Sequence, residues 1–235
     1  MKAIILAAGF ATRLYPITLN KSKSLLEINN KPIIDYIVEK IEEIEDINEI
    51  IVITNNKFYQ DFLNWKRDRK TLTIINDGVS DLEKRLGAIG DLLFVINEKK
   101  IDDDFLLISG DNLFDYSLKE PYEIFKREGK NLSLFYDVKN IEEAKRFGVA
   151  LIENNTIIDF EEKPQNPKST LCSSSTYFFK KSIINLKEFG RGIVDQPGLF
   201  LQYLYKQVPV YAYITNGKWI DIGTKESFEK AQKEF

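Results

Sequence analysis

Residues 2–36 read KAIILAAGFATRLYPITLNKSKSLLEINNKPIIDY. The run from Ala3 to Leu6 is apolar, rich in isoleucine and too short for a helix, which is typical of a buried strand of a parallel sheet. The residues that follow carry almost no side chain, and Gly9 can take a positive φ, so backbone amides could approach a ligand closely. Arg13 and Lys23 come soon after. A strand end with free N–H groups and two cations indicates a phosphate site, although an ordinary strand-to-helix connection fits this turn alone equally well.

The chain has 235 residues, of which 43% are hydrophobic and 29% charged, as in one or two soluble α/β domains. Its net charge of −3 provides no basic field for nucleic acid or an anionic membrane. No apolar run approaches the ~20 residues of a membrane span, and the first residues lack the layout of a signal peptide. We therefore expect a cytoplasmic protein that binds neither nucleic acid nor membrane, and the sequence leaves homo-oligomerisation open.

Histidine is absent, and Cys172 is the only cysteine. A thiolate nucleophile would lack its usual base, so we interpret Cys172 as a packing residue, and a lone cysteine agrees with a reducing cytoplasm. The composition excludes Ser-His and Cys-His catalysis and histidine-ligated zinc. It leaves attack of a phosphate on a triphosphate open, because that nucleophile is already an anion and needs only alignment and charge neutralisation.

Strand and helix patterns alternate over the first 112 residues. The expected strands cover 3–6, 50–54, 72–75 and 105–108. One helix is expected to begin at Lys31-Pro32, a second to cover 58–65 and a third to cover 82–97. The inner side of the third helix is expected to carry Leu86, Ile89, Leu93 and Ile96. This βαβαβαβ order predicts an α/β protein with a doubly wound, Rossmann-like three-layer α/β/α fold and a mostly parallel central sheet.

The pattern changes after Asn112. Further strands are expected at 133–138, 148–152, 157–160, 176–179, 210–214 and 218–220, and further helices at 122–126, 197–205 and 225–233. Asn154-Asn155 between two strand patterns indicates a hairpin turn. No linker or repeat separates the parts, so we predict a single domain over 1–235. Its nucleotide-binding half is about 1–112 and its acceptor-binding half about 113–235.

Three segments, LAAGFATRLYPIT (6–18), KSKSLL (21–26) and KPIIDY (31–36), resemble the opening of the sugar-phosphate nucleotidyltransferases, or NDP-sugar pyrophosphorylases, and of the glucose-1-phosphate thymidylyltransferases among them. The family pattern is L-A-A-G-x-G-T-R-L-x-P-x-T, then P-K-x-L, then K-P. Ala11 stands where the second glycine is usual, and Ser22 where the proline is usual. The resemblance implies the nucleotide-diphospho-sugar transferase fold. It also implies transfer of a nucleotidyl group from a nucleoside triphosphate to a sugar 1-phosphate, such as glucose 1-phosphate, with release of pyrophosphate.

Two later motifs carry aspartates, S-G-D-N at 109–112 and W-I-D-I-G-T at 219–224. A carboxylate just past a strand end can reach a metal near phosphates, although a turn in which Asp111 bonds its own backbone is the commoner arrangement. Asp221 lies between apolar residues, where a lone carboxylate is costly unless it is paired or binds a cation. The motifs resemble the family's G-D-N and W-x-D-x-G-T, which implies that Asp111 and Asp221 bind Mg²⁺.

Two motifs of the second half resemble the family's acceptor side. F-E-E-K-P at 160–164 could by itself be a solvated charge cluster closing a hairpin. Its resemblance to the family's E-E-K-P implies that Glu162 holds sugar hydroxyls and Lys163 the sugar phosphate. F-G-V at 147–149 resembles Y-G-V, which implies that the Gly148 amide touches the sugar. The segment D-x-P-G-L-F-L-Q-Y-L at 195–204 resembles a helix start of several relatives and is given only a structural role.

Two stretches depart from the family pattern. Ser175 stands two residues before Tyr177, where many relatives have a glycine that lines the sugar pocket, so we expect a pocket of different shape. Residues 76–90 replace the usual Q-x-x-P-x-G-L-A. Here the amide of Asn76 could read a base, and Gly87 could allow close approach of the backbone, but their spacing leaves the base undetermined.

Together, these motifs give one expected site. The expected catalytic residues are Arg13, Lys23 and Asp111. The expected nucleotide contacts are Ala8, Gly9, Thr12, Arg13, Lys23, Asn76, Gly87 and Asp111; the acceptor contacts are Gly148, Glu162 and Lys163; and the Mg²⁺ ligands are Asp111 and Asp221.

Alternatives from other classes remain. A nicotinamide-dependent oxidoreductase would need G-x-G-x-x-G and an acid after the second strand, where this chain has Asn55-Asn56-Lys57. A catalytically silent nucleotide-sugar sensor would be favoured by loss of Lys23 or of a metal aspartate, and all of these are present. A cytidylyltransferase for a non-sugar phosphate such as phosphocholine stays open.

Overall fold

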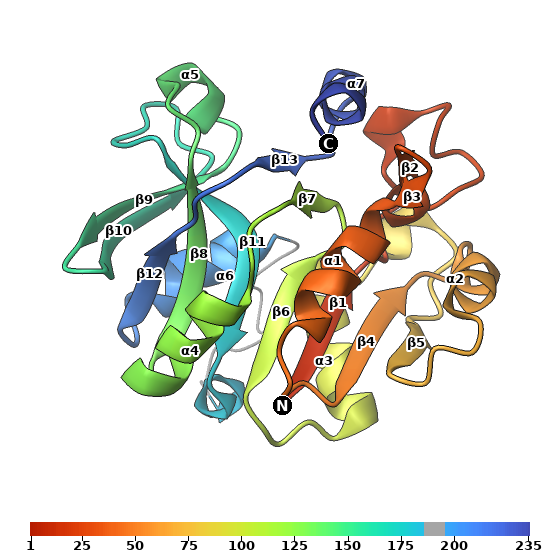
Figure 1. The fold of residues 1–235 in the computed structure, drawn as a ribbon, viewed down its shortest axis with the longest axis horizontal. Coiled ribbons are helices and arrows are strands. Elements are labelled where there is room, and N and C mark those ends of the chain that lie inside the picture. Colours follow the sequence, from red (N-terminus) through yellow and green to blue (C-terminus); the bar gives the residue numbers. More distant parts are fainter. Residues whose placement is uncertain (186–195) are drawn as a thin grey trace.

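The computed structural model describes residues 1–185 and 196–235, and its centre is a nine-stranded sheet (Figure 1). Four strands of the first half lie parallel in the order β5-β4-β1-β6. They span Lys2–Leu6 (β1), Glu49–Thr54 (β4), Leu72–Asn76 (β5) and Phe105–Ser109 (β6). Because β1 is central and later strands add on both sides of it, the predicted doubly wound α/β fold is confirmed.

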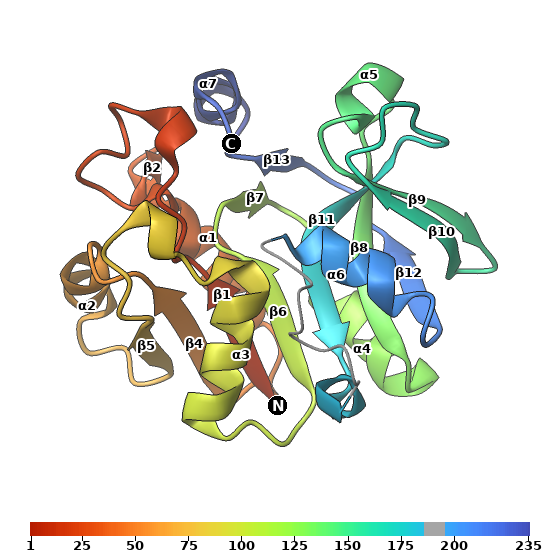
Figure 2. The ribbon, with the colours of Figure 1, turned by 180° about the vertical axis from the view of Figure 1, so that it is seen from behind.

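Helices cover both faces of this parallel part, as the two opposite views show (Figures 1 and 2). They span Ile33–Glu42 (α1), Tyr59–Lys66 (α2) and Gly87–Lys99 (α3). Ile37 of α1 belongs to the same buried cluster as Ile5 of β1. Leu92 of α3 belongs to the cluster on the other face, with Ile4 of β1. Successive strand residues point to opposite faces, so the isoleucine-rich β1 supplies both hydrophobic cores and the fold has three layers.

The second half extends the same sheet in the full order β5-β4-β1-β6-β11-β8-β12-β10-β9. Its strands span Asn131–Asp137 (β8), Gly148–Glu153 (β9), Thr156–Glu162 (β10), Leu171–Phe179 (β11) and Val210–Ile214 (β12). β11 runs antiparallel to β6 and to β8, whereas β8 and β12 are parallel. The sheet is therefore parallel in the first half and mixed in the second. Helices α4 (Lys119–Glu128) and α6 (Pro197–Leu204) cover its opposite faces.

The remaining elements lie outside the nine-stranded sheet. They are β2 (Glu27–Ile28), β3 (Lys31–Pro32), β7 (Asn112–Phe114), α5 (Ile141–Ala144), β13 (Trp219–Asp221), α7 (Lys225–Glu234) and 3-10 turns at Thr12–Leu14, Lys23–Leu25, Leu82–Lys84 and Lys181–Asn185. β7 and β13 pair in antiparallel register, with Asp221 opposite Asn112. This pairing brings the second aspartate motif beside the first. None of the helices in the described ranges is long and apolar enough to cross a membrane.

The predicted helix over 82–97 begins later than expected. Residues 82–84 form a separate 3-10 turn, and α3 starts at Gly87, whose φ is +76°. The placement of Leu86 on the inner side was wrong: it is 41% exposed, and the buried apolar residues of α3 are Ile89, Leu92, Val95 and Ile96. The positive φ of Gly87 turns the chain before the helix starts, and the preceding residues Leu82, Arg85 and Leu86 line a cavity.

Most other predicted elements are present with ends displaced by a few residues. Asn154 and Asn155 both have positive φ, 47° and 57°, as the tightest hairpin turns require, and they join β9 to β10. Lys31-Pro32 does not open α1 as predicted: these residues pair with Glu27–Ile28, and the helix begins at Ile33, with Pro32 as its N-cap.

Candidate active site

Two cavities meet beyond the carboxyl ends of β1 and β6. The larger cavity, about 490 Å³, is lined by the turn after β1, by residues 22–24 and by parts of the segment between β5 and α3. The smaller cavity, about 350 Å³, is lined mainly by residues of β9, β10, β11 and the start of α6. Both are lined by Arg13, Ser109 and Asp111, together with Gln196 and Pro197. The parallel strands thus open into a cleft where two ligands would share one wall.

The turn after β1 forms the floor of the larger cavity and is fixed from both sides. The buried Asn55 donates a hydrogen bond from Nδ2 to the Ala8 carbonyl, 2.8 Å away, and Thr18 donates one to the carbonyl of Ala11, also at 2.8 Å. Ala11, not Gly9, takes the left-handed conformation, with φ 51° and ψ 42°. The family's usual second glycine matches this backbone position, and here an alanine occupies it under strain.

Most predicted nucleotide contacts line the larger cavity. They are Ala8, Gly9, Thr12, Arg13, Lys23, Gly87 and Asp111. Asn76 does not line it: its amide nitrogen donates to Asn56 Oδ1 at 2.9 Å, and its amide oxygen accepts from the Gly78 backbone at 2.9 Å. The neighbouring Asp77 lines the cavity instead, and burial raises the pKa of its carboxyl.

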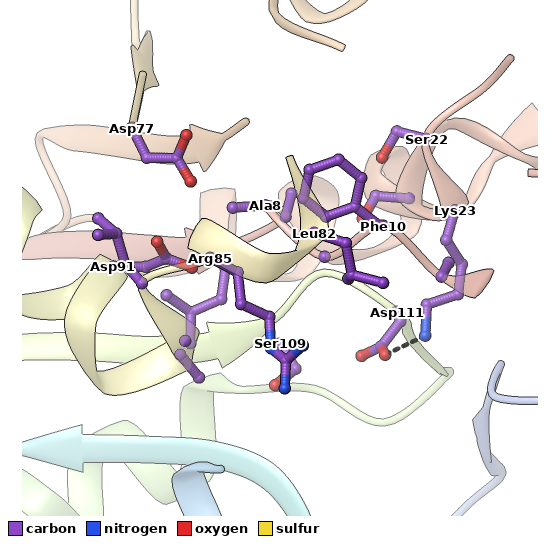
Figure 3. A pocket seen from close by; sticks show the side chains of 18 of the residues that line it. Ala8, Phe10, Ser22, Lys23, Asp77, Leu82, Arg85, Asp91, Ser109 and Asp111 are labelled. Carbon is purple, nitrogen blue, oxygen red and sulfur yellow. Dashed lines mark hydrogen bonds and ion pairs between the residues drawn. The ribbon is translucent and has the colours of Figure 1, made fainter. Parts of the chain in front are cut away.

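The two ends of the larger cavity differ in chemistry (Figure 3). At one end Lys23 Nζ lies 2.5 Å from Asp111 Oδ2, and both side chains are mostly buried. Asp77 and Asp91 lie at the other end, and the Arg85 side chain extends between the two ends toward Ser109. The sequence did not indicate these three as site residues. The first end has the charges that could bind a polyphosphate and its counter-ion, and the second end is polar.

Asp221 enters the same region from β13. The Ile222 amide donates to the Asp111 carbonyl at 3.0 Å, which holds the two aspartate segments together. Burial, and then the charge of Asp111, raise the pKa of Asp221 to about 6, while Lys23, Arg13 and Arg146 oppose the rise. A Cβ added at Gly223 would stand 2.7 Å from Asp221 Oδ2 and 3.9 Å from Arg13 Nη2, so these side chains surround one point.

This pair of carboxyl groups fits a divalent cation. The pKa of Asp221 is raised first by burial and then by repulsion from Asp111, and a cation between the two carboxylates would oppose both effects. The described residues hold no group of three or more acids, cysteines or histidines suited to a metal. Mg²⁺ is commonly held by one or two carboxylates together with substrate phosphates, so Asp111 and Asp221 match that arrangement.

Glu162 is the central acid of the smaller cavity. Its carboxylate fills the space beside two glycines: a Cβ at Gly148 would lie 2.7 Å from Oε2, and a Cβ at Gly198 would overlap it. The Glu162 amide donates to Gln202 Oε1 at 2.8 Å, which ties β10 to α6. Burial raises the pKa of Glu162, and the charge of Lys163 opposes the rise, with Lys163 Nζ 3.5 Å away. Gly148, Glu162 and Lys163 all line this cavity, as predicted acceptor contacts should.

The structure adds residues that the motifs missed. Gln196, Pro197 and Gly198 line the smaller cavity, so the purely structural role given to 195–204 is incomplete, and Asp195 lies outside the described residues. Arg146 also lines this cavity, and its signal was its position two residues before Gly148. Cys172 packs as predicted: it is fully buried with Ala144 and Val149, and burial raises the pKa of its thiol to about 12.

Fold and site together define an α/β protein with two adjoining cavities, one beside a turn that carries Arg13 and the other lined by Glu162. The profile of the nucleotidyl transferase family matches residues 2–235, and the chain belongs to this family. The resemblance read from the motifs is thus confirmed. The chain is 34% identical to the glucose-1-phosphate thymidylyltransferase of Neisseria meningitidis, over 98% of this chain and 81% of the relative.

Other relatives carry different names. Identity is 30% with the bifunctional protein GlmU of Methanocaldococcus jannaschii, over 99% of this chain and 54% of the relative. It is 29% with mannose-1-phosphate guanylyltransferase 1 of Arabidopsis thaliana, over 97% and 63% respectively. The chain therefore spans between about half and two thirds of these two relatives.

Solved structures agree on the fold. A Bacillus anthracis protein, provisionally named a glucose-1-phosphate thymidylyltransferase and solved with a sucrose, superposes with a TM-score of 0.84 at 30% identity, over 99% of this chain and 94% of that one. A UDP-glucose pyrophosphorylase in complex with UDP-glucose gives a TM-score of 0.79 at 22% identity, over 99% and 97%, which supports the fold alone.

Proposed function

We propose that this protein transfers a nucleotidyl group from a nucleoside triphosphate to a sugar 1-phosphate, with glucose 1-phosphate as the first acceptor to test. The observation that carries the proposal is the shared wall: Arg13 and Asp111 line both cavities. Two anions bound in these cavities would meet at a cation and a metal-binding carboxylate. Family membership supports the reaction class.

The triphosphate is proposed to lie over the turn after β1. Backbone amides of Ala8 and Gly9 and the side chains of Arg13 and Lys23 would neutralise it, since amides and cations at a strand end bind phosphate. The base would extend toward Gly87, which carries no side chain and can therefore take its φ of +76° and leave that wall open. Asn76 stays a proposed base contact only if its hydrogen bond to Asn56 breaks.

The acceptor is proposed to occupy the smaller cavity. Glu162 would accept hydrogen bonds from sugar hydroxyls, the Gly148 amide would donate to the sugar, and Lys163 would bind the sugar phosphate. One oxygen of that phosphate then forms a bond to the α-phosphorus while the bond from this phosphorus to the bridging oxygen breaks. The electron pair leaves with pyrophosphate. No proton has to move, which agrees with a chain that lacks histidine.

Magnesium is the proposed cofactor, and Asp111 and Asp221 would hold it. When bound, a divalent cation would neutralise charge on the reacting phosphates. The chain's own contribution is geometric: the β7–β13 pairing brings Asp221, which lines the smaller cavity, beside the segment of Asp111, which lines both cavities, where the phosphates of both reactants would meet.

The proposal is tested by pyrophosphate release with Mg²⁺ over a grid of nucleoside triphosphates and phosphorylated acceptors, sugar 1-phosphates and phosphocholine included. Activity with one or a few sugar 1-phosphates is expected. The matched variants are Lys23→Ala, expected to lose activity, and Lys21→Ala, an exposed lysine two residues away that pairs with Glu27. Activity confined to phosphocholine would favour the cytidylyltransferase alternative. Tight nucleotide-sugar binding without turnover would favour a sensor.

The setting of the reaction is part of the same proposal. We place it in the cytoplasm, away from membrane and nucleic acid, because the chain has one buried cysteine and a small net negative charge. We also propose that residues 1–112 bind the nucleotide and 113–235 the acceptor within one domain. Sedimentation of the purified chain would decide whether it forms a homo-oligomer.

A further inference from the structure

Strand β11 departs from regular geometry where it borders the smaller cavity. Its register against β8 shifts between Ser173 and Tyr177. Within this irregular stretch Ser175 has a φ of +52°, in the left-handed region. A residue with a Cβ is strained there, whereas glycine is not. A strained backbone beside a cavity points to a functional role for the residue. At this position the backbone is strained because Ser175 carries a side chain.

Three hydroxyl groups gather at this point. Ser173 Oγ lies 3.1 Å from the Tyr177 hydroxyl, and both side chains are buried. Burial raises the pKa of Tyr177, and hydrogen bonds from Ser173 and Ser175 oppose the rise, so the third hydroxyl also lies against the phenol. We call Ser173, Ser175 and Tyr177 the hydroxyl cluster. All three line the smaller cavity, as Glu162 does.

The neighbouring hydroxyls of β11 are used inside the fold. Ser174 Oγ donates to the Leu134 carbonyl at 3.3 Å, and Thr176 Oγ1 donates to the Ser174 carbonyl at 3.3 Å. The hydroxyl cluster instead contacts the cavity. It is neutral and can both donate and accept, so it suits a hydroxyl of a ligand better than a phosphate.

We propose that the hydroxyl cluster reads one free hydroxyl of the sugar ring of the acceptor, and that Ser175 is a specificity-determining residue. This rests on the proposed function, because it takes the smaller cavity as the acceptor site. The substrate class is then a sugar 1-phosphate that carries a hydroxyl at the carbon facing β11. An analogue lacking that hydroxyl would lose its hydrogen bonds to the cluster, and a site built to bond a substrate hydroxyl rejects the deoxy analogue more strongly than an apolar site does.

Two substitutions at one position separate the hydroxyl from the strain. Ser175→Ala removes the hydroxyl and keeps a Cβ at positive φ, whereas Ser175→Gly removes both. Lys100→Gly is the matched control for strain, because Lys100 is exposed, has a φ of 48° and lies at the end of α3, away from both cavities. Ser117→Ala is the control for loss of a hydroxyl, because the exposed Ser117 donates a hydrogen bond to Glu43.

The experiment compares kcat/KM for the best sugar 1-phosphate and for its monodeoxy analogues in each variant. For the wild-type protein, kcat/KM should be about 10-fold or more lower for the analogue deoxygenated at one particular carbon, and we call this ratio the deoxy penalty. Ser175→Ala and Ser175→Gly should reduce that penalty to about 2-fold and leave the penalties at the other carbons unchanged, while both controls keep it. Ser175→Gly should have a higher Tm than Ser175→Ala, which shows that the strain at this position is real.

Two results would overturn the inference, and they differ. If wild type is active but both Ser175 variants retain the full deoxy penalty, the hydroxyl cluster does not read the acceptor and the proposed function stands. If wild type releases no pyrophosphate with any sugar 1-phosphate, the proposed function is wrong and this inference falls with it.

Discussion

Lys23 and Asp111 form an ion pair, with Nζ 2.5 Å from Oδ2, at the end of the larger cavity where a polyphosphate would lie. The cation proposed to bind the triphosphate and the carboxylate proposed to bind Mg²⁺ therefore neutralise each other in this structure. Both partners are mostly buried, so neither could lose the other without a replacement charge. Nucleotide and metal together would supply both replacements, which couples the binding of one to that of the other.

Asp111→Asn should move nucleotide affinity and turnover in opposite directions. Without the carboxylate charge Lys23 is free to bind phosphate, so affinity for the triphosphate in EDTA should rise about 3- to 10-fold by calorimetry, the range of the net contribution of one hydrogen bond. Turnover with Mg²⁺ should fall at least ~100-fold, the scale of losing one electrostatic contact to a transition state. Asp102→Asn, at an exposed acid that pairs with Lys181, should change neither quantity. If the variant bound the triphosphate more weakly than wild type in EDTA, Asp111 and phosphate would not compete for Lys23.

The raised pKa of Asp221 makes the stability of the metal-free protein depend on pH. Its pKa is about 6 in the folded chain and near 3.9 when unfolded, so between about pH 4 and 6 the folded state holds a proton that the unfolded state has released. This contribution to the free energy of unfolding therefore decreases as pH rises through that window. The full shift corresponds to at most about 3 kcal/mol.

Asp221→Asn should remove this pH-dependent term. In EDTA at pH 7 the variant should be more stable than wild type by about 2 kcal/mol, and the difference should shrink toward zero by pH 4. Urea unfolding of both proteins across this range measures it, and only the difference between them is informative, because other carboxylates such as Glu49 have lowered pKa values. Mg²⁺ should stabilise wild type and not the variant. A variant less stable than wild type at pH 7 would contradict the burial of an uncompensated charge.

Ala11→Gly should stabilise the protein. Ala11 has φ 51° and ψ 42°, a conformation that costs a residue with a Cβ about 1–2 kcal/mol. Glycine removes this strain but loses more backbone entropy on folding, so a net gain of about 0.5–1 kcal/mol in the free energy of unfolding is expected. Ala8→Gly is the matched control in the same turn, since Ala8 has an ordinary φ, and it should be destabilising. Equal changes at the two positions would show that the turn relaxes around either residue.

The sequence was sufficient for the parts of the fold with long periodic patterns. The isoleucine-rich β1 and the helix pattern of α1 gave the parallel half, since strand and helix periods leave a strong signal. The approach of Asp221 to Asp111 depends on three-residue strands, β7 and β13, which are too short for any period and are more than one hundred residues apart. Only the family motifs could indicate it.

Local conformation was harder to predict from residue type. Gly9 can take a positive φ, yet the left-handed residue of this turn is Ala11, whose carbonyl accepts a hydrogen bond from Thr18. Leu86 fits the apolar pattern of α3 but lies exposed, because Gly87 turns the chain before the helix starts. In both places the preference of a single residue yields to contacts made by the rest of the chain.

Gly198→Ala should impair the acceptor side alone. Its new methyl group would overlap Glu162 Oε2 and displace the carboxylate from the smaller cavity. KM for the sugar 1-phosphate should rise about 10-fold or more, the effect of misplacing one hydrogen-bonding side chain. KM for the triphosphate should not change, because Gly198 does not line the larger cavity.

Glu162→Ala should also raise KM for the sugar 1-phosphate, and it vacates the space that the methyl group of Gly198→Ala needs. The double variant should therefore be no worse than Glu162→Ala. Losses that add in the double variant would show that Gly198 acts independently of Glu162.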